Sequence, residues 1–230
     1  MDFKIIGGSF PVVECKLDKG QRMITQSGAM AWMDSSITME TTSNGGIGKV
    51  LGRMFTNEHL FQNIYTSQKD DSKICFGTNV PGSIIPIRLQ DGQSIICQKS
   101  SFLASYGNIE LSTFFNKRLG IGLFGGEGFL MQKISGDGIV FIEIDGSSKE
   151  LYLEAGQQLI LSTGYLVLMD QTCSIDIQTV RGIGNILLGG QGIFNTVVTG
   201  PGKVVLQTMP IEKLANAIIP FVPTPPSNND

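Results

Sequence analysis

The residues that could perform nucleophilic or metal chemistry are few and widely spaced. The sequence has four cysteines, Cys15, Cys75, Cys97 and Cys173, and a single histidine, His59. Without a C-x-x-C pair or a second histidine, zinc clusters, thioredoxin-type redox sites and multi-histidine metal sites are not expected. A Cys-His or Ser-His pair through His59 remains conceivable, but no G-x-S-x-G or other nucleophile signature accompanies it. We therefore interpret His59 as a structural residue and predict no catalytic residue, no metal and no cofactor.

Residues 120–125 have the spacing G-x-G-x-x-G, and Glu143 follows 18 residues after the last glycine. That arrangement would suit a dinucleotide whose ribose contacts the acid. A true fingerprint, however, opens a helix inside a βαβ unit, whereas here further glycines follow and the next apolar run is strand-like. Glycine-rich segments at 45–48 and 182–184 are its counterparts. We interpret all three segments as loops between structural units.

The same three loops carry cations and no acidic residue. The segments are 44–55, 116–124 and 181–188, and their cations are Lys49, Arg53, Lys117, Arg118 and Arg181. A threefold arrangement would gather them into one basic loop face that suits an anionic membrane surface or an acidic protein partner. The alternative is that the loops only connect units and that their apolar residues pack under neighbouring subunits.

The overall charge argues against a nucleic-acid partner. The 230 residues include 17 Lys and Arg against 20 Asp and Glu, a net charge of −3, so no polybasic anchor and no binding to duplex DNA are expected. The N-terminus lacks the features of a signal peptide, and no stretch approaches the roughly 20 apolar residues of a membrane span. We expect a cytoplasmic protein with reduced thiols.

The elements that must position these residues are predicted to be strands. Apolar residues alternate with a period of two in Leu151-x-Leu153, Leu159-x-Leu161, Leu166-x-Leu168 and Ile175-x-Ile177, and each run is bounded by turn residues. Charged residues make up only 16% of the chain, against about 25% in an average domain, so few helical surfaces are expected. One short helix is predicted from Ile211 to Ile219, followed by a mobile Pro-rich tail.

An internal repeat organises these strands. The pattern Leu-x-x-Gly-x-x-x-Ile begins at Leu17, Leu89 and Leu153, and the match continues without a gap for about twenty residues. Each copy has an upstream partner, a turn similar to Gly-Pro-Gly followed by a strand, at 80–82, 136–138 and 200–202. The three leucines are therefore predicted to be buried at equivalent positions. The last glycine of each turn, Gly82, Gly138 and Gly202, is predicted to adopt a turn conformation that disfavours side chains.

The repeat register also assigns some of the reactive side chains. Cys15 and Cys173 align with apolar residues of the other copies and are predicted to be core residues, whereas Cys75 and Cys97 stay ambiguous. Asp34 and Asp170 align with each other at a strand end, where an acid is usually a turn-former.

The repeats predict an all-β fold of three quasi-equivalent units around a pseudo-threefold axis. The single domain covers residues 1–210, divided at about 45–116, 117–180 and 181–210 plus 1–44, so that the N- and C-terminal strands complete one unit. Residues 211–230 form the helix and the tail. Such a closed arrangement would remove most free strand edges.

Several motifs together resemble the altered-inheritance-of-mitochondria family, a mitochondrial biogenesis family, in its bacterial and archaeal branch of unknown function. The motifs are Ser27–Met33, Pro81–Ile87, Ser101–Ala104, Gly189–Gly192 and Gly200–Gly202, and the resemblance extends from Phe3 to Pro210. It implies a fold similar to that of the tryptophan RNA-binding attenuator protein (TRAP), a short double-stranded β-helix, with three such units per chain. It implies no catalytic residue.

From these observations we expect a non-enzymatic scaffold or interaction protein, with a membrane-surface association through the basic loop face as an extension. A homo-oligomer is expected, and a trimer is favoured because the related fold assembles in rings. The alternative is a module that binds a small ligand or single-stranded RNA, which the acidic balance and the single tryptophan, Trp32, disfavour. An enzyme ranks third.

Overall fold

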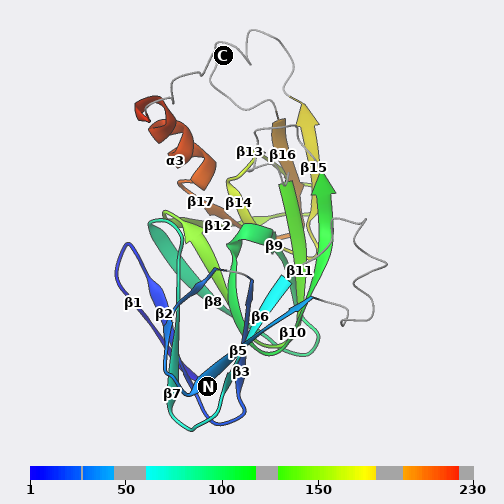
Figure 1. Ribbon diagram of the computed structural model, residues 1–230. Helices are drawn as coiled ribbons and strands as arrows, with labels where there is room; N and C mark the ends of the chain where they lie inside the picture. Colours follow the sequence, from blue (N-terminus) through cyan, green and yellow to red (C-terminus); the bar gives the residue numbers. More distant parts are fainter. Residues whose placement is uncertain (27, 44–60, 118–128, 180–193, 223–230) are drawn as a thin grey trace, which may run out of the picture.

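The computed structural model describes residues 1–26, 28–43, 61–117, 129–179 and 194–222, and antiparallel strands dominate this part of the chain (Figure 1). The predicted all-β class is therefore confirmed. The strands are β1 (Asp2–Ile6), β2 (Val12–Leu17), β3 (Arg22–Gln26), β4 (Met30–Met33), β5 (Ile37–Ser43), β6 (Phe61–Ser67), β7 (Ser72–Gly77), β8 (Gly82–Leu89), β9 (Ser94–Gln98), β10 (Phe102–Lys117), β11 (Phe129–Asp145), β12 (Ser148–Leu153), β13 (Gln158–Ser162), β14 (Leu166–Asp170), β15 (Ser174–Thr179), β16 (Phe194–Thr199) and β17 (Gly202–Gln207).

The helical elements are short. A 3-10 turn, η2 (Lys99–Ser101), precedes β10, and the helix α3 (Ile211–Ile218) continues into the 3-10 turn η4 (Ile219–Phe221). The helix predicted from Ile211 is thus confirmed. It ends at Ile218, and Pro220, which has no backbone N–H to donate, lies in the 3-10 turn that follows. Within the described residues, no helix is long and apolar enough to cross a membrane.

The described strands form three antiparallel sheets. One has the order β1-β2-β7-β4, the largest runs β12-β17-β14-β9-β11-β10-β3-β6-β5 with β8 added to β11, and the third is β13-β16-β15. In Figure 1, β1, β2 and β7 lie at the end of the molecule that holds the N-terminus, whereas β13, β15, β16 and α3 lie at the opposite end. The long hairpin of β10 and β11 connects the two ends.

The burial of side chains follows the alternation that the sequence predicted. In β2, the side chains of Val13, Cys15 and Leu17 are fully buried, whereas their neighbours point outward. Leu17, Leu89 and Leu153 are 0%, 2% and 7% exposed, as predicted, and each belongs to a different apolar cluster. The core is therefore distributed along the molecule in three parts.

The predicted conformation of the three turn glycines needs correction. Residues 136–138 lie inside β11 and form no turn, and of the three glycines only Gly202 has a positive φ, +147°. Side chains are nevertheless excluded, because a Cβ on Gly82 would collide with the carbonyl oxygen of Ile144 and one on Gly138 with that of Tyr106. The cause is the close approach of a neighbouring strand, which the local sequence does not reveal.

The prediction that the N- and C-terminal strands complete one unit is not confirmed. β17 pairs with β12 and β14, while β2 pairs with β1 and β7, and within the described residues no ladder joins the two terminal segments. The repeat register alone could not distinguish these arrangements, because equivalent strands have the same apolar pattern whichever unit they join.

Candidate interaction surface

The predicted basic loop face falls almost entirely outside the described residues. Lys49, Arg53, Arg118 and Arg181 lie in segments 44–60, 118–128 and 180–193, as do His59 and the G-x-G-x-x-G segment. Lys117 is the last residue of β10, opposite Phe129 on β11, and its side chain is not described. The gathering of these cations on one face therefore stays a prediction.

All four cysteines are free and buried, so the two that the sequence left ambiguous belong to the core as well. Removal from water raises the pKa of Cys15 and of Cys97 to about 12 and that of Cys75 to about 11, and it also raises the pKa of Cys173. The thiolate is the reactive form, so these thiols are poor nucleophiles and poor metal ligands near neutral pH. No group of three or more metal-ligating side chains occurs in the described residues.

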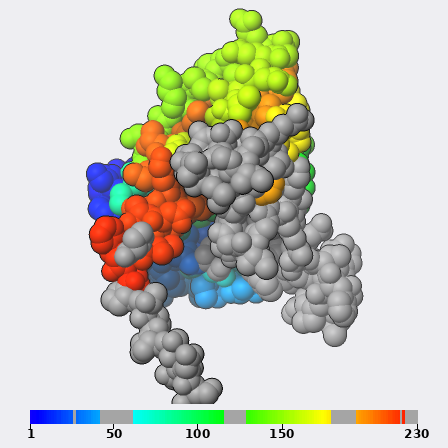
Figure 2. All heavy atoms as spheres, turned by 90° about the horizontal axis from the view of Figure 1, so that it is seen from above, coloured from blue at the N-terminus to red at the C-terminus, as the bar shows by residue number. Residues whose placement is uncertain are grey.

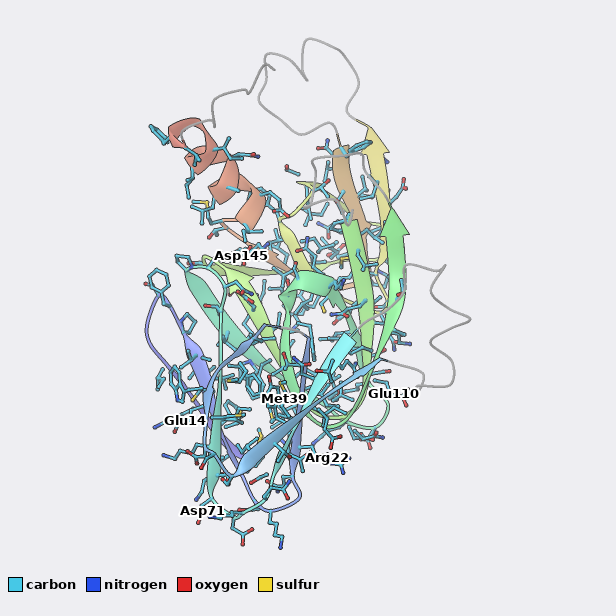
Figure 3. The ribbon with its side chains drawn as sticks, viewed as in Figure 1. Glu14, Arg22, Met39, Asp71, Glu110 and Asp145 are labelled. Atoms are coloured by element: carbon cyan, nitrogen blue, oxygen red, sulfur yellow. The ribbon has the colours of Figure 1, made fainter. Side chains whose placement is uncertain are left out.

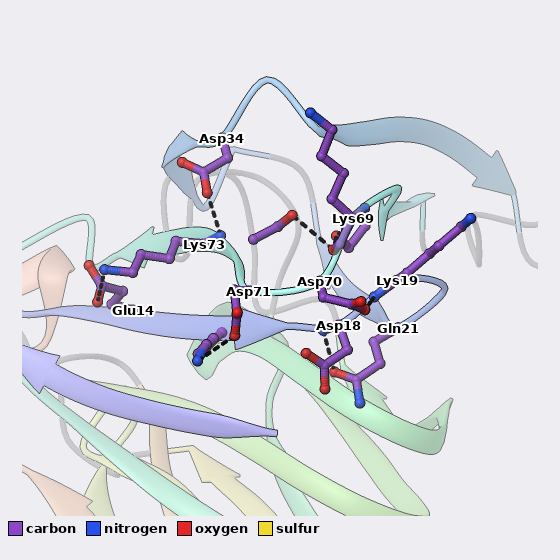
Figure 4. A network of polar contacts seen from close by, with 12 residues as sticks. Glu14, Asp18, Lys19, Gln21, Asp34, Lys69, Asp70, Asp71 and Lys73 are labelled. Carbon is purple, nitrogen blue, oxygen red and sulfur yellow. Dashed lines mark hydrogen bonds and ion pairs between the residues drawn. The ribbon is translucent and has the colours of Figure 1, made fainter.

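Asp34 and Asp170 form equivalent turns, as the sequence predicted. The carboxylate of Asp34 accepts a hydrogen bond from the backbone N–H of Lys73 at 2.8 Å (Figure 4), and that of Asp170 accepts one from Lys203 at 2.8 Å. Each aspartate also accepts a backbone bond of 3.0 Å, from Ile37 and Cys173 respectively. Both acids hold a turn against a neighbouring strand.

The charged residues near these turns pair with one another at the surface. Figure 4 shows Glu14 beside Lys73 and Asp70 beside the backbone of Lys19. The Lys73 ammonium lies 3.7 Å from the Glu14 carboxylate, and the Lys19 N–H donates a hydrogen bond of 2.9 Å to Asp70. Lys4 also contacts Glu14 at 3.1 Å and lowers the pKa of that carboxyl. Exposed pairs of this kind contribute little free energy, and the acids here serve to hold turns and strands.

Two acids on β11 have structural roles. Glu143 is buried and accepts hydrogen bonds from the backbone N–H of Asn79 at 2.6 Å and from its side-chain amide at 3.3 Å. Asp145 lies beneath α3 (Figure 3) and accepts a hydrogen bond of 2.9 Å from the N–H of Ile211, one of the N–H groups of the first turn that have no partner within the helix. Burial raises the pKa of both carboxyls to about 6. Glu143 thus anchors a loop, which agrees with the interpretation that it is no ribose ligand.

Apolar side chains are exposed on two strands that lie at the edges of their sheets. β4 pairs with β7 alone and β13 with β16 alone among the described strands. Trp32 on β4 is 51% exposed and Ile160 on β13 is 62% exposed. An open edge that presents large apolar side chains is a surface on which another strand can pair.

A third apolar surface is formed by the C-terminal helix. No residue of α3 is buried, and Ile211, Ile218, Ile219, Phe221 and Val222 are exposed. The helix is held at its first turn by Asp145 and by a hydrogen bond of 2.8 Å from the Lys213 ammonium to the Tyr165 hydroxyl. Figure 2 shows α3, in red, on the outside of the molecule. The sequence predicted this helix but not its exposure, which depends on where the sheets end.

The fold and family follow from comparison with known proteins. The chain is similar to a crystal structure of protein SPYM3_0169 from Streptococcus pyogenes, with a TM-score of 0.76 and 24% identity over 96% of this chain and 99% of that one, a likeness of fold. No curated protein matches the chain. The family model described as mitochondrial biogenesis AIM24 matches residues 3–209, nearly the whole region for which the motifs indicated it. The chain therefore belongs to the mitochondrial biogenesis AIM24 family.

Proposed function

We propose that this protein is a non-enzymatic scaffold that assembles with further copies of itself. The observation that carries the proposal is that large apolar side chains are exposed at three separate places in the described residues, namely Trp32 on the open edge strand β4, Ile160 on the open edge strand β13, and α3. Open strand edges of this kind are places where another strand can pair. A homo-oligomer would cover them, and a trimer is the form we favour.

The architecture proposed for the scaffold is three quasi-equivalent units similar to TRAP. The strand order supports it, because the arrangement of two three-stranded groups recurs three times. The groups are β2-β7-β4 with β3-β6-β5, then β8-β11-β10 with β9-β11-β10, then β12-β17-β14 with β13-β16-β15. The units on this view are continuous stretches of chain, from β2 to β7, from β8 to β11 and from β12 to β17.

A turn that recurs in each stretch supports the same architecture. Gly20, Gly92 and Gly156 have φ values of +82°, +73° and +78°. The residue immediately after each glycine is a glutamine, at positions 21, 93 and 157. Its side-chain oxygen accepts a hydrogen bond from the backbone N–H three residues before it, at 2.9, 3.4 and 2.9 Å. Agreement of dihedral angle and side-chain bond at three sites is what a repeated unit predicts.

Sedimentation velocity at micromolar concentration tests the scaffold. We expect a species heavier than the 24.8 kDa chain, with a trimer near three times that mass. A single species near 24.8 kDa at every concentration up to the solubility limit would refute the proposal. A cytoplasmic location remains a prediction from the sequence.

A membrane-surface role is the second candidate, because the exposed apolar residues of α3 could insert between lipid headgroups. Flotation with anionic liposomes tests it. The membrane version predicts flotation that fades as salt rises and that is lost when Lys49, Arg53, Lys117, Arg118 and Arg181 are changed to Gln. A control with the same change of charge elsewhere, at the exposed residues Lys19, Arg22, Lys69, Arg88 and Lys149, should still float. Absence of flotation at low salt would end this candidate.

A further inference from the structure

Two strand pairings join the proposed units to one another inside the chain. β10 pairs antiparallel with β3, with Ser105 opposite Ile24 and Tyr106 opposite Met23. β14 pairs antiparallel with β9, with Met169 opposite Ile96 and Asp170 opposite Ile95. In each case an edge strand of one unit lies against an edge strand of the preceding unit.

The two pairings have the same register. In the repeat alignment, Ser105 and Met169 occupy one position, and Ile24 and Ile96 occupy another. Both pairings set these two positions opposite each other. A register shift of one residue would turn every side chain to the other face of the sheet, so the agreement indicates one specific contact used twice.

The third pairing of this kind is not made within the described residues. In the first unit, the strand that corresponds to β10 and β14 is β4. In the third unit, the strand that corresponds to β3 and β9 is β13. Figure 1 shows β13 near one end of the molecule and β7, the partner of β4, near the other. Their exposure agrees with a missing partner. Trp32 is 51% exposed, although its equivalents Ala104 and Leu168 are fully buried. Ile160 is 62% exposed, although its equivalents are fully buried (Ile96) or half-buried (Ile24).

We propose that β4 of one copy pairs antiparallel with β13 of a second copy, so that chains join head to tail. Applying the internal register, Met33 lies opposite Ile160, Trp32 opposite Leu161 and Asp34 opposite Leu159. This inference rests on the scaffold function and the repeats proposed above, and it names the contact that they leave open.

A second copy of the chain is the occupant because the two open edges complement each other. Within the chain, this contact joins β10 to β3 and β14 to β9. β4 is equivalent to β10 and β14, and β13 is equivalent to β3 and β9. Each copy therefore presents both partners of the contact, at separate places. Such a heterologous contact closes into a ring when its rotation permits. The other edge strands of the described residues, β1, β5, β8, β12 and β15, have no such internal template.

Engineered cysteines test the register directly. Residues opposite each other in an antiparallel pair have Cβ atoms about 4.5–5.5 Å apart, which is close enough for a disulfide after small adjustments. Chains with Met33→Cys alone and Ile160→Cys alone are mixed, allowed to exchange and oxidised. We expect a disulfide-linked dimer, of twice 24.8 kDa, only in the mixture of the two. The matched control is Met39→Cys, an exposed methionine on β5, mixed with Ile160→Cys, which should give no dimer (Figure 3 labels Met39).

A second variant separates this contact from the general assembly. Ile160→Lys places a charge in the proposed strand pair and should reduce sedimenting oligomer to the single chain, whereas Tyr152→Lys, at another exposed apolar position, should leave it assembled. Four results would overturn the inference. The first two are a wild-type protein that forms oligomers although the Met33→Cys and Ile160→Cys mixture gives no disulfide-linked dimer, and an oligomer that persists in Ile160→Lys. The other two are a Met33→Cys, Ile160→Cys double variant whose disulfide forms only within one chain, and a Met39→Cys mixture that cross-links as much as the Met33→Cys mixture. In the first two cases the scaffold itself stands, whereas a monomeric wild type would refute the scaffold.

Discussion

Truncation of the three equivalent leucines offers the most direct test of the distributed core. Leu17→Ala, Leu89→Ala and Leu153→Ala each remove apolar atoms from a different buried cluster. Large-to-small changes at such sites cost roughly 2–5 kcal/mol, because transfer free energy is lost and a cavity remains. Leu17 and Leu89 have almost no exposed surface, so about 4 kcal/mol is expected for each, and about 2–3 kcal/mol for Leu153, which is 7% exposed.

The assay is urea unfolding at one fixed protein concentration, because assembly would otherwise change the apparent stability. Midpoints followed by circular dichroism and by tryptophan fluorescence would be compared with those of Tyr152→Ala. Tyr152 is 73% exposed on β12, so its truncation should change the free energy of unfolding by no more than about 0.5 kcal/mol. If any leucine variant unfolded within about 1 kcal/mol of the parent, that position would not be part of the core as described.

Three further predictions concern β11 and the thiols. Gly138→Ala should lower the free energy of unfolding by at least about 2 kcal/mol, since its Cβ meets the Tyr106 carbonyl oxygen, and a variant as stable as the parent in urea would contradict this close approach. Because burial raises the Glu143 pKa from 4.5 to about 6, its contribution to stability is full below pH 4.5 and is lost as the pH rises through 6. In the wild type, this group lowers the free energy of unfolding at pH 7.5 relative to pH 4.5 by about 2 kcal/mol, and Glu143→Gln should remove that loss. If the variant and the parent showed the same dependence of unfolding free energy on pH, the carboxylate would be better solvated than its burial indicates. Iodoacetamide at neutral pH should label none of the four buried cysteines until urea unfolds the chain, and rapid labelling of the native protein would contradict their placement.

The candidate surface could be predicted only in part from the sequence. The burial of Cys15 and Cys173 and the turns of Asp34 and Asp170 followed from the repeat register, because each depends on a few neighbouring residues and their alternation. The exposure of Trp32 and Ile160 could not be predicted in this way. The equivalent residues Ala104, Leu168 and Ile96 are buried and Ile24 is half-buried, and what differs is whether a neighbouring unit lies beside the strand.

The sequence by itself determined the strand class, the short helix from Ile211 and the buried positions of Leu17, Leu89 and Leu153. These features depend on alternation and spacing over a few residues, which one strand or turn contains entirely. Only the tertiary structure decided that β17 joins β12, that Gly138 lies in a strand against a carbonyl oxygen, and that β4 and β13 remain open. Pairing between strands some fifty residues apart depends on which of several similar apolar edges meet in space, and a repeated sequence gives those edges nearly the same pattern.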